Sequence, residues 1–168
     1  MKIRKARNRE LIEEHFSTIW PAQIAGFTRF IVQLRKAFDG DLDMMVVLAV
    51  IGDRTRPENW ARELVDYRSL TRDGAGERRQ EPLNVQSISD FTGIPRETVR
   101  RKIAALETRG WIRKDEKGHI TALHTASSDL KDATGEAIEY LSTIATAFDV
   151  ARENAVPAPN LARDGKDR

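Results

Sequence analysis

The sequence predicts a mainly α-helical protein with one small β-hairpin. Stretches near both ends place apolar residues at the three- and four-residue spacing of amphipathic helices. Between them, residues 84–123 divide into two short helices and a hairpin. With 40% apolar and 32% charged residues, the composition is typical of a helix-rich globular chain, and the absence of cysteine excludes disulfides and thiolate chemistry.

A helix–turn–helix is predicted between Asn84 and Gly110. Asn84 is a favourable N-cap for the first helix, and Gly93 permits the sharp reversal that follows it. Pro95 opens the second helix where its missing N–H costs nothing, and Gly110 ends that helix. The residues expected to face the core are Val85, Ile88 and Phe91 in the first helix, and Val99, Ile103 and Leu106 in the second.

The second helix and the segment after it form a basic surface. The side chains expected to point away from the core are those of Arg96, Glu97, Arg100, Arg101 and Ala104. Two β-capable runs, 111–112 and 120–123, flank a charged turn and predict a hairpin. Residues 95–119 hold eight Arg or Lys against four Asp or Glu, although the whole chain carries only +2. Two helices and a hairpin make a winged helix-turn-helix, and the basic outward helix predicts double-stranded DNA as the partner.

The run from Pro95 to Arg101 resembles the recognition helix of Crp-type regulators, in which Ser-Arg-Glu-Thr-Val-x-Arg enters the major groove. It departs from that pattern at Pro95, where serine is usual, and at Arg100, where a small residue is common. The resemblance implies that Arg96, Glu97 and Arg101 read bases and that Thr98 contacts phosphate. It covers only residues 84–123, and nothing in the chain looks like the cyclic-nucleotide β-roll of those regulators. The helical flanks resemble MarR-type regulators, whose terminal helices build a dimer.

Base chemistry agrees with these roles. Arg96 and Arg101 are expected to make bidentate contacts to guanine, and Glu97 to accept from cytosine N4. The residues expected to contact the DNA backbone are Thr98, Arg100, Lys102, Arg113, Lys114 and Lys117. A run of charged residues is more often a solvated helix face than a binding site. Within a helix-turn-helix, DNA binding becomes the favoured explanation.

Residues 1–40 are predicted to be a helical dimerisation region. From about residue 8 to 38 a broad apolar stripe, rich in aromatics, follows helical spacing. Pro21 either kinks this helix or starts its second half. This apolar stripe is larger than one winged-helix domain needs to cover its own core. A dimer interface is therefore favoured over burial of the stripe within a single chain. Residues 42–51 are apolar on all sides and predict the first helix of the winged-helix core. A buried strand is the alternative that the sequence leaves open.

The DNA-binding domain is expected to span residues 41–125, with a polar insert at about 53–82. Within the insert, residues 57–65 predict a short helix and residues 69–81 a loop. The arginines of that loop either reach phosphate or are simply solvated.

A C-terminal dimerisation helix is predicted at residues 126–153. The N-cap candidates are Ser127, Ser128 and Asp129. A coiled-coil-like seam, which suits a second subunit, is formed by Ala137, Leu141, Ile144 and Phe148, and widened by Ile138 and Ala145. Residues 154–168 predict a disordered tail.

The sequence shows no catalytic constellation, and neither an enzyme nor a cofactor is expected. His15, His119 and His124 lie on three different elements without the spacing of metal ligands. No run of about 18 apolar residues and no signal-peptide core is present, which predicts a cytoplasmic protein without a membrane partner. A small-molecule effector pocket is a further possibility, although aromatic residues at helical spacing are more often plain core. Its candidate lining is Trp20, Phe27, Phe30, Met44, Met45 and Trp60.

The prediction is therefore a homodimeric, sequence-specific transcriptional regulator on a pseudo-palindromic operator, with half-sites about 34–36 Å apart or a multiple of this. The alternative is a winged helix used for protein interaction or assembly without DNA readout. That use would call for apolar residues on the outward face of the second helix, where this chain has arginines.

Overall fold

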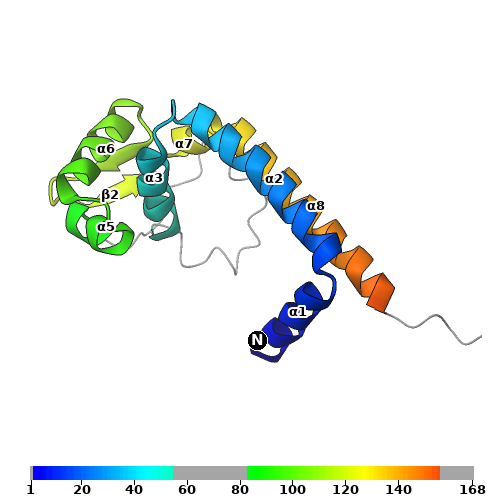
Figure 1. Cartoon of the computed structure of the whole chain (residues 1–168). Coiled ribbons are helices and arrows are strands. Elements are labelled where there is room, and N and C mark those ends of the chain that lie inside the picture. Colours follow the sequence, from blue (N-terminus) through cyan, green and yellow to red (C-terminus); the bar gives the residue numbers. More distant parts are fainter. Residues whose placement is uncertain (1, 55–82, 156–168) are drawn as a thin grey trace, which may run out of the picture. The chain divides into compact units, whose positions relative to one another are not determined.

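The computed structural model describes residues 2–54 and 83–155. The described elements, in chain order, are helices α1 (Lys2–Glu14), α2 (Phe16–Ala37), α3 (Leu42–Arg54), α5 (Val85–Thr92) and α6 (Arg96–Thr108), strands β1 (Ile112–Lys114) and β2 (Ile120–Ala122), and helices α7 (His124–Asp129) and α8 (Lys131–Ala155) (Figure 1). The strands pair antiparallel, with Arg113 opposite Thr121. The predicted fold class, helices with one small hairpin, is confirmed.

The chain divides into two compact units. The winged-helix unit comprises Phe30–Glu136, and the helical unit comprises the residues up to Arg29 together with those from Ala137 onward. Both divisions fall inside a long helix, α2 and α8, whereas the sequence placed boundaries near residues 40 and 125. Those domain boundaries therefore stay predictions. The short helix at 57–65, the loop at 69–81 and the tail from 156 onward lie outside the described residues.

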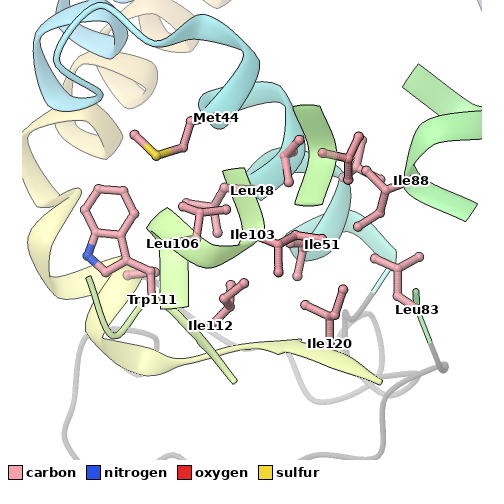
Figure 2. Packing of buried hydrophobic residues seen from close by; sticks show 14 of the residues in the cluster. Met44, Leu48, Ile51, Leu83, Ile88, Ile103, Leu106, Trp111, Ile112 and Ile120 are labelled. Carbon is pink, nitrogen blue, oxygen red and sulfur yellow. The ribbon is translucent and has the colours of Figure 1, made fainter. Parts of the chain in front are cut away.

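The core of the winged-helix unit is built by α3, α5, α6 and the hairpin, whose apolar side chains point toward one another in Figure 2. The three core residues expected on α6, Val99, Ile103 and Leu106, are all buried. The amide of Ile120 donates to the carbonyl of Leu83 at 2.9 Å, which ties the segment before α5 to the edge of β2. Burial of these apolar faces is the main force that holds the unit together.

The helix ends follow the expected chemistry. Asn84 and Ser87 form a reciprocal capping box at the start of α5, with the Ser87 amide 3.0 Å from Asn84 Oδ1. Gly93 then adopts a left-handed φ of 73°. Gly110, with φ 68°, ends α6 in a Schellman motif, in which the Trp111 amide donates to the Leu106 carbonyl at 3.0 Å. α6 itself begins one residue after Pro95.

Two expectations about burial are wrong in the winged-helix unit. Phe91 is 61% exposed, and the Arg54 guanidinium lies 4.9 Å from its ring centroid instead. Three-residue steps each turn a helix back by about 60°, so Phe91 is rotated by about 120° from Val85 and leaves the core face. Residues 42–51 are a helix and not a strand, but Leu42 and Ala49 are exposed, so this helix is not buried all round.

The helix boundaries differ from the predictions at both ends of the chain. The N-terminal helix is interrupted at His15, between α1 and α2, whereas Pro21 lies inside α2. The N-cap candidates Ser127–Asp129 lie within α7 and not at the start of α8. Asp129 Oδ2 instead accepts from the Trp111 indole N–H at 2.8 Å, and Ser127 Oγ donates to the His124 carbonyl at 2.7 Å.

The helical unit has only a small buried cluster. Ile19, Ala147 and Ala151 are its buried cluster, and Leu11 and Phe148 are among the partly buried residues around it. Gly26 faces Tyr140 so closely that a Cβ at this position would lie 2.7 Å from the ring. The Tyr140 hydroxyl donates to the Gln23 side chain. The absence of a side chain at Gly26 therefore lets α2 and α8 approach within this unit.

Candidate nucleic-acid interface

The turn between α5 and α6 is fixed by three side-chain hydrogen bonds. Ser89 Oγ donates to the Ile94 carbonyl at 2.8 Å, and Thr92 Oγ1 donates to the Ile88 carbonyl at 2.8 Å. Thr92 Oγ1 also accepts from the Ile94 amide at 3.1 Å. These bonds, together with the left-handed glycine, hold α6 in one orientation on α5. A helix that has to read DNA bases needs such a rigid support.

The outward face of α6 carries the predicted base-reading residues. Arg96, Glu97, Arg100 and Arg101 are all exposed, and Thr98 is half-buried. Arg100 Nη1 lies 3.6 Å from Glu97 Oε2, and Arg101 Nη2 lies 3.4 Å from Thr98 Oγ1. Such long, exposed contacts contribute little stability, so these side chains can rearrange when a partner approaches.

Lys102 lies on a different side of α6. Its ammonium contacts Asp41 Oδ2 at 2.7 Å, and only 21% of the side chain is exposed. Asp41 Oδ1 accepts the Met44 amide at 3.0 Å and so caps the first turn of α3. Lys102 follows Val99 by three residues and precedes Leu106 by four, so it borders the buried stripe, a signal that the sequence analysis did not use. This ion pair argues against a DNA backbone contact at Lys102, which stays a prediction.

The carboxyl group of Asp41 responds to this environment. Burial raises its pKa, but the hydrogen bonds from Lys102 and from the Met44 amide, with the charges of Lys102 and Arg109, outweigh burial. The net result is a pKa below the ordinary value for aspartate. Asp41 is therefore expected to be ionised at neutral pH and to hold α6 to the start of α3.

A second anchor joins the end of α6 to the end of α2. Arg109 Nη2 contacts Asp39 Oδ2 at 2.6 Å, and its guanidinium carbon lies 4.9 Å from the Trp111 ring centroid. Arg109 Nη1 also donates to the Ala37 carbonyl at 3.3 Å. Asp39 has a left-handed φ of 52°, a conformation that aspartate tolerates better than most residues. Sequence reasoning missed this anchor, because Asp39 and Arg109 are 70 residues apart.

The wing presents further basic residues. Arg113, Lys114 and Lys117 are exposed on β1 and the turn. Asp115 closes the turn: its Oδ1 accepts the His119 amide at 2.8 Å, and its Oδ2 lies 3.0 Å from His119 Nδ1. The bond from the His119 amide is the main reason that the pKa of Asp115 lies below its ordinary value. The wing is therefore a closed turn that displays cations beside α6.

The described residues among the six of the proposed effector pocket belong to both units of the chain. Met44 is buried in the core of the winged-helix unit, with Met45 partly buried against it, and Phe30 is half-buried. Trp20 and Phe27 are exposed on the part of α2 that belongs to the helical unit, and Trp60 lies outside the described residues. A shallow groove of about 370 Å³ in the helical unit has none of the six in its lining. The effector pocket stays a prediction.

Neither a metal site nor a membrane-spanning helix is found within residues 2–54 and 83–155. In this part of the chain no three His, Asp or Glu side chains group as a metal site requires. None of the helices found there combines the length and the apolar character needed to cross a bilayer.

Residues 61–126 match the family model of the Crp-like helix-turn-helix domain. The matched segment is less than half of the chain, and its described part holds α5, α6, the hairpin and the first residues of α7. No curated protein and no solved structure matches the chain. The resemblance of the helical flanks to MarR-type regulators is not confirmed. The family match, together with the exposed basic face of α6 and the wing, supports a DNA-binding transcription regulator that carries a winged helix-turn-helix.

Proposed function

We propose that this protein is a homodimeric, sequence-specific transcriptional regulator that binds a pseudo-palindromic operator. The observation that carries the proposal is the division of α6 into two faces. One face is buried through Val99, Ile103 and Leu106, and the opposite face displays arginines. The Crp-like match over this region supports the same use.

The proposed contacts follow from side-chain chemistry and exposure. Arg96 and Arg101 donate to guanine O6 and N7, and Glu97 accepts from cytosine N4. Contacts to phosphate come from Thr98, Arg100, Arg113, Lys114 and Lys117. Lys102 is left out of the set because Asp41 already binds its ammonium.

A homodimer places two α6 helices in successive major grooves, so the half-sites are expected about 34–36 Å apart or at a multiple of this. Regulation by a small apolar ligand is a lesser proposal that rests on the aromatic content of α2. A thermal-shift screen with apolar acids and aromatics addresses it, and the absence of any stabilising compound would remove it.

The rival function is a winged helix that binds protein and not DNA. The outward face of α6 argues against this function. Its exposed apolar residue is the small Ala104, which has charged neighbours. Protein-binding helices use larger apolar anchors. Phe91 is such a residue, but it lies on α5 beside Arg54.

Selection from random double-stranded DNA at about 0.15 M salt, followed by anisotropy titrations, tests the proposal. We expect enrichment of a palindrome with guanine at a fixed half-site position. Binding without a consensus, lost steeply as salt rises, would indicate a non-specific architectural protein instead. No binding to any DNA would leave the protein-interaction function as the better proposal.

A further inference from the structure

The part of α2 in the helical unit exposes a stripe of large apolar side chains. Phe16, Trp20, Ile24 and Phe27 follow one another at spacings of four, four and three residues and are each 44–50% exposed. The rings of Phe16 and Trp20 stack on each other, with centroids 4.9 Å apart. This helical spacing aligns the four side chains on one side of the helix. They are therefore a continuous surface and not scattered exposed residues.

α8 adds two more exposed apolar side chains, Ile138 at 47% and Leu141 at 62%. The residues that fill the inside of the unit are different ones, Ile19, Ala147 and Ala151. On both helices the exposed residues are rotated from those inward residues in the same sense, by about 60–140° on α2 and by about a quarter turn or more on α8. α2 and α8 therefore turn their large apolar residues to the same flank. We call the six residues Phe16, Trp20, Ile24, Phe27, Ile138 and Leu141 the apolar face.

The opposite flank of the helical unit has another character. It is the shallow groove, whose lining includes the hydroxyl side chains of Thr18, Ser142 and Thr146 and the carboxylate of Glu139. The groove mixes polar side chains with small apolar ones and lacks the large apolar side chains of the first flank, so it provides a control surface for mutagenesis.

The apolar face carries no charge of its own, and the segments of α2 and α8 that hold it contain almost no charged residues. Residues 16–28 contain no Asp, Glu, Lys or Arg, and residues 137–148 contain only Glu139, which lines the groove on the other flank. A two-fold interface brings the same patch of both subunits together, so a charge near the axis would meet its own copy. A neutral patch suits this pairing. A lipid surface, in contrast, is usually recognised by apolar residues rimmed with lysine or arginine.

The exposed area is also of the right order for a dimer. Aromatic side chains have about 150–250 Å² each and Ile and Leu somewhat less, so the six at about half exposure offer roughly 500 Å². A stable interface buries about 800 Å² on each partner, so these side chains supply more than half of it before their neighbours are included.

We propose that a second copy of this chain docks on the apolar face, so that α2 and α8 of two protomers pack around a two-fold axis. This inference rests on the proposed homodimer and assigns it a surface. The side chains inside the helical unit hold α2 to α8, and the apolar face remains for the partner subunit.

Sedimentation equilibrium over a range of concentrations tests this assignment with the full-length protein. Ile24→Glu on α2 and Leu141→Glu on α8 each place a carboxylate on the apolar face. Because both subunits carry the change, each variant introduces two carboxylates into the proposed interface. We expect each to raise the dimer dissociation constant at least about 100-fold, since like charges across an interface are costly. The matched control is Val150→Glu, because Val150 is an aliphatic residue 40% exposed in the lining of the groove. Its dissociation constant should match that of the wild type.

The outcomes separate the surface from the function. Far-UV circular dichroism first establishes that each variant keeps its helices, and two variants on different helices guard against a local folding defect. A dimer that survives both Ile24→Glu and Leu141→Glu, or that Val150→Glu disrupts equally, would overturn the assigned surface. A wild-type monomer at all concentrations would overturn it too, and its sedimentation with phosphatidylglycerol vesicles would identify a lipid-binding face instead. The monomeric variants should still bind a single half-site of the operator. If the wild type itself binds no DNA, the proposed regulator function is refuted, and not only the assigned dimer surface.

Discussion

The two units of this chain use their apolar residues in opposite ways. In the winged-helix unit most large apolar side chains, such as Phe38, Ile88 and Leu106, are buried, although Leu42 and Phe91 are exposed. In the helical unit the buried residues include Gly26, Ala147 and Ala151, and large ones such as Trp20 and Leu141 are exposed. The first unit buries most of its large apolar side chains within itself, whereas the second leaves several of them exposed to water. The difference is what we expect if the winged-helix unit binds DNA and the helical unit, as proposed above, packs against a second copy of the chain.

Two leucines test this comparison most strongly. Leu106→Ala empties a fully buried site on α6 and should lower the free energy of unfolding by about 2–5 kcal/mol. Leu141→Ala removes a side chain that is 62% exposed, and should change the stability of the monomer by less than about 0.5 kcal/mol. Urea denaturation at low protein concentration measures both. Equal losses would mean that the helical unit buries Leu141 after all and would break the comparison.

A smaller effect is expected from two basic residues on different sides of α6, Lys102 beside Asp41 and Arg100 on the outward face. Lys102→Met breaks the ion pair with Asp41 and should cost about 1–2 kcal/mol of stability, between the values for exposed and buried charged hydrogen bonds. Arg100→Met should leave stability nearly unchanged but reduce the slope of DNA affinity against salt by about 0.9 for each phosphate that the variant no longer neutralises. Urea denaturation and anisotropy titrations at several salt concentrations, run on both variants, provide the two readouts. A flattened salt slope in Lys102→Met would restore Lys102 to the DNA-binding set.

The smallest effect concerns acid stability. Because the pKa of Asp41 is lowered in the folded protein, its contribution is complete above the ordinary aspartate value near 3.9 and is lost as pH falls through the lowered pKa. Urea denaturation at a series of pH values should show stability falling below about pH 4, with a shallower fall in Asp41→Asn. Lys102→Met should flatten the same curve, since it removes a partner of the carboxylate. Identical curves for the wild type and both variants would contradict this role of the ion pair.

Local patterns predicted much of the winged-helix unit. The buried stripe of α6, the cap at Asn84 and the glycine turns at Gly93 and Gly110 depend on residues close in sequence, and all are confirmed. The basic outward face of α6 followed from the same periodicity. Its role in base reading remains a proposal, because exposure alone does not identify what a side chain contacts.

Sequence reasoning had less to work with where distant residues decide the outcome. Lys102 borders the buried stripe, but only the fold brings Asp41 within 2.7 Å of it. The seam predicted on α8 mixed residues of two kinds, because Leu141 is exposed while Ile144 is half-buried. Apolar spacing identifies a helix with a buried side, but it does not distinguish burial inside the chain from burial against a partner.

The most direct test of the central claim, that α6 reads DNA sequence, is a cycle of one protein change and one base change. Affinities are measured for wild type and Arg101→Ala, each on the selected operator and on operators altered at single base pairs. We expect Arg101→Ala to lose about 1–3 kcal/mol on the operator and to become indifferent to the base at one position. An equal loss on every sequence would contradict base reading by Arg101 and would assign this residue to the phosphate backbone.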